Sequence, residues 1–209
     1  MIYSALIPMK NLVKAKSRLA SHISQHQREA LVLDMLHHVL HVLLESRLLA
    51  RVYVVSSDSS ILAQAKTWGA QPLIEEQQGH NAALYAAALR ATDASAILTI
   101  SADLPLLCTG DIQAMIDQSK QYQLVLASSL DCTGTNAMLV RPPLALPYLF
   151  GPNSLQRYLD AARQKHLNST VLHRLGLAFD VDTIGDLREL AVVRSESRDE
   201  NEPVLCHVT

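Results

Sequence analysis

The sequence predicts a single α/β domain in which helices cover both faces of a mainly parallel sheet. Short apolar runs rich in β-branched residues alternate with amphipathic helical patterns, as in repeated β–α–β units. The chain has 209 residues, enough for one sizeable core and few for two. Apolar residues make up 49% of it and charged residues 18%, a balance that excludes extensive disorder.

The first half of the chain carries the clearest β–α–β pattern. Ser24 and Gln27 have the spacing of a capping box, and they open a long amphipathic helix that extends to Glu45. A second helix begins after residue 58 and ends near Gly69, because glycine suits the position just beyond a helix. We expect strands at residues 2–7, 51–56, 71–74 and 96–100, and a third helix at 81–91.

The second half continues the same alternation with less regular spacing. We expect helices at residues 111–120 and 154–165, strands at 124–127 and 136–140, and a last strand and helix within 178–193. Residues 194–209 are polar, charged and poorly periodic, which is typical of a mobile tail. The predicted organisation is therefore one domain at residues 1–193 followed by this tail.

The net charge and the absence of long apolar segments argue against a nucleic-acid-binding protein and against a membrane protein. Eighteen Lys and Arg against twenty Asp and Glu give a net charge of -2, so no overall basic field exists to hold a nucleic acid. The amino terminus lacks a signal-peptide pattern, and no apolar run is long enough to span a membrane. These observations favour a cytoplasmic protein that binds small molecules and has neither a nucleic-acid nor a membrane partner.

A basic loop follows the first strand. It contains Lys10, Lys14, Lys16 and Arg18, and no acidic residue precedes Glu29. Because ligands of open α/β sheets bind beyond the carboxyl ends of strands, this loop is a candidate site for a triphosphate. The alternative is a solvated loop with no ligand.

Three aspartates have positions that suit a divalent cation. Asp103 directly follows an apolar strand, and Asp180 and Asp182 alternate in a segment whose side chains point the same way if it is a strand. Mg²⁺ takes one or two carboxylates and fills its other positions with water and phosphate oxygens. The alternatives are a turn at Asp103 and helix capping by Asp182.

Two glycine-containing polar turns, residues 133–136 and 150–154, are candidate anion sites. The second leads into a helix, whose first N–H groups and the Ser154 hydroxyl suit a phosphate or a carboxylate. Plain turns are the alternative for both. The chain has no Walker, dinucleotide-binding, zincin or nucleophile-elbow motif, so these less specific segments carry the search for a site.

Taken in order, these segments resemble the 2-phospho-L-lactate guanylyltransferase family (CofC/FbiD) of coenzyme F420 biosynthesis. The matching segments run from residue 7 to about residue 187. They are residues 7–10, 15–19, 79–81, 101–106, 134–137, 150–154 and 179–183. The joint pattern is much more specific than any single segment.

The resemblance implies a fold and a reaction. The fold is a three-layer, Rossmann-like sandwich with a mainly parallel, mixed sheet, as in molybdenum-cofactor guanylyltransferases and glycosyltransferase-A domains. The reaction moves GMP from GTP to the phosphate of a small carboxylic acid and releases pyrophosphate. The acceptor in the family is 2-phospho-L-lactate, phosphoenolpyruvate or 3-phosphoglycerate, and a homodimer is a possible assembly.

The resemblance also implies roles for particular residues. Lys10, Lys16 and Arg18 would bind the GTP phosphates, with Lys10, Arg18 and Asp103 as the catalytic group. Mg²⁺ would be held by the carboxylates of Asp103, Asp180 and Asp182. Thr135, Gly151 and Ser154 would receive the acceptor. The sequence has no side-chain signature for guanine recognition, which backbone groups near Gly79 and Asn81 could supply.

The sequence departs from the family pattern at two positions. Both bear on which substrates bind, and neither touches the metal carboxylates. The family's glycine-leucine-asparagine string here contains His80, and Tyr158 stands where members often carry histidine. One alternative is a related nucleotidyltransferase that acts on a sugar phosphate or a pterin cofactor. The other is a non-catalytic nucleotide-binding subunit that has kept the fold.

Overall fold

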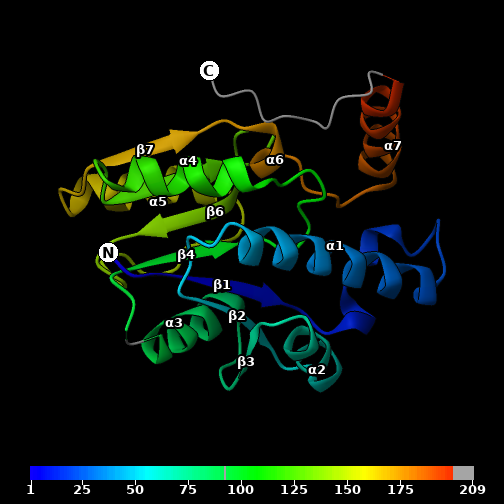
Figure 1. Ribbon diagram of the computed structural model, residues 1–209, viewed down its shortest axis with the longest axis horizontal. Helices are drawn as coiled ribbons and strands as arrows, with labels where there is room; N and C mark the ends of the chain where they lie inside the picture. The colour runs from blue at the N-terminus through cyan, green and yellow to red at the C-terminus, as the bar shows by residue number, and fades with distance from the viewer. Residues whose placement is uncertain (92, 200–209) are drawn as a thin grey trace.

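The computed structural model describes residues 1–91 and 93–199, and its centre is a seven-stranded mixed sheet (Figure 1). The strands are β1 (Tyr3–Met9), β2 (Arg51–Ser56), β3 (Gln71–Ile74), β4 (Ala96–Ile100), β5 (Leu124–Ser128), β6 (Thr135–Val140) and β7 (Ser169–Leu172). Their order across the sheet is β3-β2-β1-β4-β6-β5-β7. Only β6 runs antiparallel to its neighbours β4 and β5, so the prediction of a mainly parallel, mixed sheet is confirmed.

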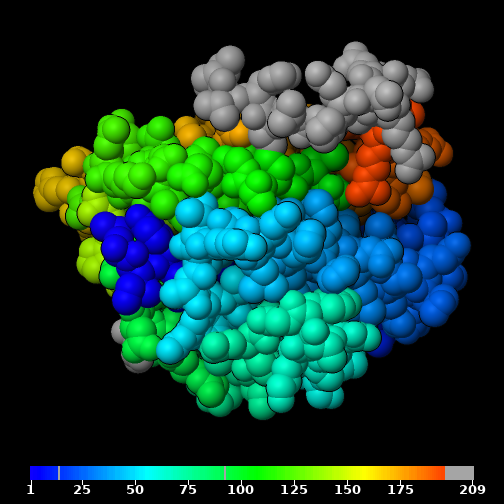
Figure 2. Space-filling model, viewed as in Figure 1, coloured from blue at the N-terminus to red at the C-terminus, as the bar shows by residue number. Residues whose placement is uncertain are grey.

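Helices cover both faces of the sheet. The helices α1 (Gln25–Glu45), α2 (Ser59–Thr67) and α4 (Thr109–Ser119) bury apolar side chains against one face, and α3 (His80–Arg90) and α5 (Ser154–Gln164) against the other. Figure 2 shows α1 between α4 and α2 on the surface of the first face. The short helix α6 (Leu175–Ala178) and the last helix α7 (Ile184–Asp199) add Leu177 and Leu190 to the same core.

The local sequence signals set the helix boundaries as expected. The Ser24 hydroxyl accepts a hydrogen bond from the Gln27 backbone N–H at 3.3 Å, and the Gln27 side chain accepts one from the Ser24 N–H at 2.9 Å. This reciprocal capping box starts α1. Gly69 follows the end of α2 with φ of 94°, a left-handed conformation that favours glycine.

The carboxyl-terminal third differs from the prediction. No strand forms near Ala178: that residue ends α6, and residues 179–183 cross the core as a loop in which Phe179 and Val181 are buried. Phe179 and Val181 alternate with Asp180 and Asp182, which is the same apolar–polar pattern that a half-buried strand shows. The actual last strand, β7, is short and half-exposed at the sheet edge, so it lacks a clear apolar pattern.

The boundary of the expected tail also shifts. The helix α7 continues through Asp199, so residues 194–199 are helical, and residues 200–209 lie outside the described part of the chain. Within residues 1–91 and 93–199, no helix combines the length and the apolar character that a membrane span requires.

The strand order places a topological switch point between β1 and β4. The chain adds β2 and β3 on one side of β1 and then returns through α3 to add β4 on the other side. Because β1 and β4 are parallel, the loops that follow them leave the sheet at the same edge, toward the side of the molecule where α7 lies in Figure 1. Open α/β sheets bind ligands at such a point.

Candidate active site

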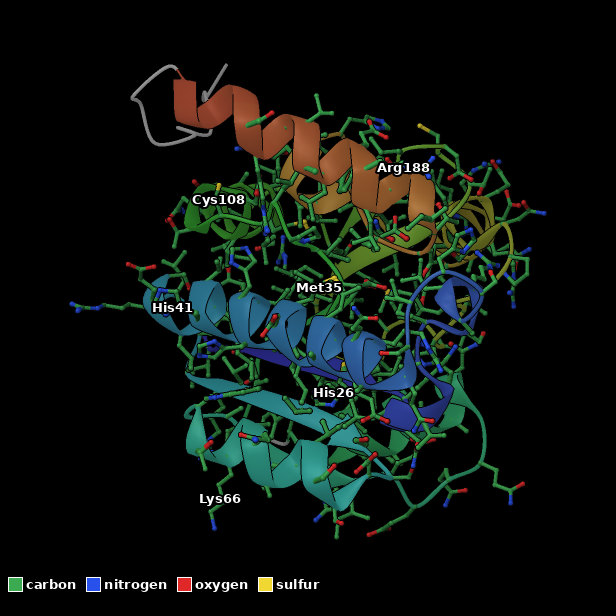
Figure 3. The ribbon with its side chains drawn as sticks, turned by 90° about the vertical axis from the view of Figure 1, so that its right-hand side faces the viewer. His26, Met35, His41, Lys66, Cys108 and Arg188 are labelled. Atoms are coloured by element: carbon green, nitrogen blue, oxygen red, sulfur yellow. The ribbon has the colours of Figure 1, made fainter. Side chains whose placement is uncertain are left out.

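A cleft of about 610 Å³ opens at this switch point. The sequence-predicted residues that line it are Lys10, Lys16, Arg18, Asp103, Gly151, Asp180 and Asp182. His80 and Phe150 add an aromatic wall, and Val32 and Met35 of α1 add an apolar one. Figure 3 is turned so that this side faces the viewer, and it shows Met35 on the edge of α1 that is turned toward α7.

Three carboxylates meet in the cleft from two distant parts of the chain. One oxygen from each of Asp103, Asp180 and Asp182 lies within 4.8 Å of the others, and all three residues are half-buried. The Val181 backbone N–H donates to the Asp103 carbonyl at 3.2 Å, which joins the two loops. The Asn136 amide donates to Asp180 Oδ1 and to the Ala178 carbonyl, both at 3.0 Å, and so orients Asp180.

Lys16 reaches into this carboxylate cluster. Its Nζ lies 2.5 Å from Asp103 Oδ2 and 2.7 Å from Asp182 Oδ1, and its side chain is only 9% exposed. Arg18 contacts the second Asp182 oxygen at 3.3 Å from an exposed position. The basic loop and the carboxylates, which lie far apart in the sequence, therefore meet in one site.

Hydrogen bonds to two other segments hold the backbone of the basic loop before Lys16. The Arg28 guanidinium of α1 donates to the Ala15 carbonyl at 3.1 Å, and Lys16 itself has φ of 50° at the start of a short 3-10 turn. Further back, Asp58 accepts a hydrogen bond from the Leu12 N–H at 3.2 Å. The Lys14 side chain, a member of the same basic loop, lies outside the described part of the chain.

The electrostatics of the cluster favour a bound cation. Burial, together with the charges of Asp103 and Asp182, raises the pKa of Asp180 above its ordinary value. Burial also acts to raise the pKa of Asp182, but Lys16 and Arg18 hold it below the ordinary value. Burial acts to lower the pKa of Lys16, but the charges and hydrogen bonds of Asp103 and Asp182 outweigh it. The pKa of Lys16 is therefore raised above its ordinary value. A hard divalent cation fits this all-oxygen donor set.

A second wall of the cleft is held by Asn81. Its amide donates to the Phe150 carbonyl and its carbonyl accepts from the Phe150 N–H, both at 3.0 Å. This pair ties the start of α3 to the turn at Gly151, whose φ of 126° requires glycine. Gly79 and Asn81 are not among the residues that line the cleft, so the Asn81 side chain supports the wall.

Asn81→Ala should therefore loosen the Phe150–Gly151 turn. We expect a loss of about 1–3 kcal/mol in the free energy of unfolding, because two backbone groups lose their partner. Urea denaturation measures this, with Gln156→Ala on the exposed face of α5 as the matched amide control. Equal stability of the two variants would contradict the supporting role.

The expected acceptor residues lie beside the cleft. Thr135 starts β6 and its Oγ1 is buried without a hydrogen-bond partner in the part of the chain that the structure describes. Ser154 starts α5 and is also buried. The Leu155 N–H donates to the Thr133 carbonyl at 3.2 Å, so these two turns meet. Of the expected acceptor residues, only Gly151 reaches the cleft surface.

An internal ion pair between Asp111 and Arg174 has no signal in the sequence. Arg174 Nε donates to Asp111 Oδ1 at 2.6 Å, and the Asp111 side chain is 2% exposed. Asp111 Oδ2 accepts the Cys108 N–H at 3.0 Å. A Cβ on Gly176 would lie 2.1 Å from Asp111 Oδ2, so only glycine fits there. The pair joins α4, which follows Asp103 in the chain, to the start of α6, which precedes Asp180.

His80 has the electrostatics of a neutral cleft residue. The residue is exposed as a whole, but the cleft walls partly enclose its ring; this desolvation, and after it the charge of Lys10, lowers the pKa of its imidazole. Since the folded pKa is depressed, its contribution to stability is present at high pH and is lost as the pH falls below the ordinary value of about 6.5.

An NMR titration of the histidine ring protons should therefore show His80 titrating below the ordinary value. Loss of its signal in His80→Gln assigns the resonance. Lys10→Met should move its midpoint upward, because a neighbouring positive charge is removed. An unshifted midpoint in both proteins would contradict this electrostatic description.

The Rossmann-like sheet, the basic loop after β1 and the carboxylates opposite it form the arrangement that the resemblance led us to expect. The chain belongs to the family of CofC-like guanylyl transferases, whose model matches residues 3–202. The fold is also that of a putative nucleotide-diphospho-sugar transferase from Desulfovibrio desulfuricans G20, with a TM-score of 0.80 at 18% identity over 97% of this chain and 92% of that one. The predicted family and fold are confirmed.

Curated relatives extend over nearly the whole chain. A phosphoenolpyruvate guanylyltransferase of Rubrobacter xylanophilus is 40% identical over 89% of this chain and 92% of its own. A 3-phospho-D-glycerate guanylyltransferase of Colwellia psychrerythraea is 32% identical over 91% of each. A 2-phospho-L-lactate guanylyltransferase of Methanothermobacter thermautotrophicus is 31% identical over 89% of this chain and 82% of its own.

Proposed function

We propose that the protein transfers GMP from GTP to the phosphate of phosphoenolpyruvate in the coenzyme F420 pathway that its family implies. One observation carries the proposal: in a chain of this family, the basic loop and three carboxylates meet in a single cleft. An oxygen of the acceptor phosphate attacks the α-phosphorus of GTP. The bond between the α-phosphorus and its bridging oxygen breaks, and pyrophosphate leaves.

Asp103, Asp180 and Asp182 would hold Mg²⁺ in this reaction. The half-buried, all-oxygen donor set and the raised pKa of Asp180 support that assignment, because both favour a cation among the carboxylates. When bound, Mg²⁺ would neutralise phosphate charge as two anions approach each other. The Asn136 amide would keep Asp180 oriented toward the cation.

The basic residues bind and position the triphosphate. One loop supplies three basic side chains that line the cleft, those of Lys10, Lys16 and Arg18. Each of them can donate hydrogen bonds to phosphate oxygens. No general base is required, because the second pKa of an acceptor phosphate is near 6 and the group is largely dianionic at neutral pH. The protein therefore acts by holding two anions in line and by stabilising the leaving pyrophosphate.

The acceptor would bind toward the two turns beside the cleft. The unpartnered Thr135 hydroxyl and the Ser154 start of α5 suit a phosphate or a carboxylate, and Gly151 allows close approach of the backbone. Phosphoenolpyruvate is the acceptor in the name of the relative with 40% identity, whereas the 2-phospho-L-lactate and 3-phospho-D-glycerate enzymes compared above are 31% and 32% identical. Guanine would lie near His80, the member of residues 79–81 that lines the cleft.

Arg18→Ala should weaken the use of GTP. Losing one charge-assisted phosphate contact costs about 1.5–3 kcal/mol of transition-state stabilisation, which lowers kcat/KM for GTP by roughly tenfold or more. Lys10→Ala should behave in the same way. Steady-state kinetics measure the effect, with Arg163→Ala and Lys66→Ala on exposed helix surfaces as charge-matched controls. Wild-type kcat/KM for GTP in both loop variants would reject this placement.

A panel of substrates tests the proposed function. Pyrophosphate release is measured with Mg²⁺ and GTP against phosphoenolpyruvate, 2-phospho-L-lactate and 3-phosphoglycerate separately, with ATP, CTP and UTP as nucleotide controls. We expect release that depends on both GTP and phosphoenolpyruvate. Faster release with another acid would replace the acceptor and keep the reaction. Binding of GTP without release for any acceptor would favour a non-catalytic subunit.

A further inference from the structure

The carboxylate cluster proposed to hold Mg²⁺ contains a cation of the protein itself. Lys16 Nζ lies 2.5 Å from Asp103 and 2.7 Å from Asp182, which are two of the three aspartates. The ammonium therefore contacts two of the three carboxylates whose ligand oxygens lie within 4.8 Å of one another. A divalent cation on the same oxygens would lie close to this positive charge and be repelled by it.

We propose that Lys16 is the resident counter-ion of the site and keeps free divalent cations out until a nucleotide arrives. The inference rests on the proposed function. A triphosphate in the cleft gives the ammonium a second set of anionic partners, so Lys16 can leave the aspartates as the nucleotide and its divalent cation bind together. Lys16 thereby makes cation binding depend on nucleotide binding, while Asp103 and Asp182 keep a positive partner in the free protein.

Lys16, among the cations of the basic loop, fits this role. Its side chain is 9% exposed and pairs with two aspartates, whereas that of Arg18 is 73% exposed and, among the described residues, pairs with one aspartate, Asp182, at 3.3 Å. The backbone around Lys16 is held in place by the hydrogen bond from Arg28 to Ala15. Exchange of partners therefore needs only rotation of a four-carbon side chain, which is flexible in lysine.

Binding of Mn²⁺ to the nucleotide-free protein tests the role, with the EPR signal of free Mn²⁺ as the readout. Lys16→Met removes the charge and keeps most of the side-chain volume. We expect it to bind Mn²⁺ about tenfold to a hundredfold more tightly than wild type, because a competing cation is gone. Lys16→Arg keeps the charge and should bind as weakly as wild type. Arg18→Met should change the affinity much less than Lys16→Met.

Two further measurements keep the result interpretable. Lys16→Met combined with Asp103→Asn should lose the gained affinity, which places the bound Mn²⁺ at the cluster. Lys16→Met should also turn over GTP more slowly than wild type although it binds Mn²⁺ more tightly, and general damage to the fold would not produce this combination. If Lys16→Met is unstable without metal, Mn²⁺ should raise its melting temperature far more than that of wild type.

Equal or weaker Mn²⁺ binding by a folded Lys16→Met, or no rescue of an unstable one, would overturn the inference. Turnover by the wild-type protein tests the proposed function independently of Lys16→Met. If wild type transfers GMP but Lys16→Met shows no gain in affinity, only the counter-ion role fails. If wild type shows no transfer with any acceptor, the proposed function fails whatever Lys16→Met does.

Discussion

Asp103→Asn should reduce guanylyl transfer by at least about a hundredfold to a thousandfold while the protein stays folded. The substitution keeps the side-chain shape and removes one of the three carboxylates that meet in the cleft. It also removes one of the two aspartates that neutralise Lys16. Stability should change little, because the loss of an ion-pair partner is offset by less repulsion among the carboxylates. The measurements are kcat with saturating substrates and the melting temperature.

The control for Asp103→Asn is Asp117→Asn on the exposed face of α4. Asp117 pairs with Lys120 at 2.6 Å on the surface, far from the chemistry in the proposed mechanism. It should therefore keep wild-type kcat. A folded Asp103→Asn with a kcat close to that of wild type would remove this carboxylate from the catalytic group.

Asp111→Ala should cause a large loss of stability. It removes the 2.6 Å partner of the Arg174 guanidinium, whose side chain is 19% exposed, and the carboxylate oxygen that accepts from the Cys108 N–H. Breaking a buried pair by removing one partner costs about 3–5 kcal/mol. For a domain of this size, that corresponds to a drop in melting temperature of roughly 6–20 °C. Urea denaturation and thermal melting both measure it.

Two comparisons separate the buried pair from ordinary charge loss. Asp117→Ala breaks an exposed ion pair and should cost no more than about 1 kcal/mol. Asp111→Ala combined with Arg174→Met should be more stable than Asp111→Ala alone, because the uncompensated charge is gone. If Asp111→Ala were no less stable than Asp117→Ala, the pair would not hold the loops that carry Asp103 and Asp180.

Local signals in the sequence predicted most of the fold. The capping box at Ser24 and the glycine after α2 act over a few residues, so sequence reasoning placed those helix boundaries correctly. β7 was missed because a short, half-exposed edge strand has no apolar alternation. The strand expected near Ala178 was wrong because burial of Phe179 and Val181 in a loop produces the same alternation.

The part of the site that directly follows the ends of parallel strands could be predicted from the sequence. Lys10, Arg18 and Asp103 follow parallel neighbouring strands, so the sheet brings them to one edge. Asp180 and Asp182 reach the cleft from a loop, although the alternation argument assumed a strand.

Side-chain partners far apart in sequence were not predictable. Lys16 is 166 residues from Asp182, and Arg174 is 63 residues from Asp111. No local pattern encodes such pairs, because they exist only once the loops are packed against each other. The same holds for the Asn136 amide that orients Asp180 from 44 residues away.

The most direct test of the central claim follows the oxygen atoms of the acceptor. The protein is incubated with Mg²⁺, GTP and phosphoenolpyruvate whose phosphate carries ¹⁸O, and the products are analysed by ³¹P NMR and mass spectrometry. The account predicts a phosphoanhydride of GMP with the acceptor that has ¹⁸O in the bridge to the α-phosphorus, and unlabelled pyrophosphate. Formation of GDP, or ¹⁸O in the pyrophosphate, would contradict direct attack of the acceptor phosphate on the α-phosphorus.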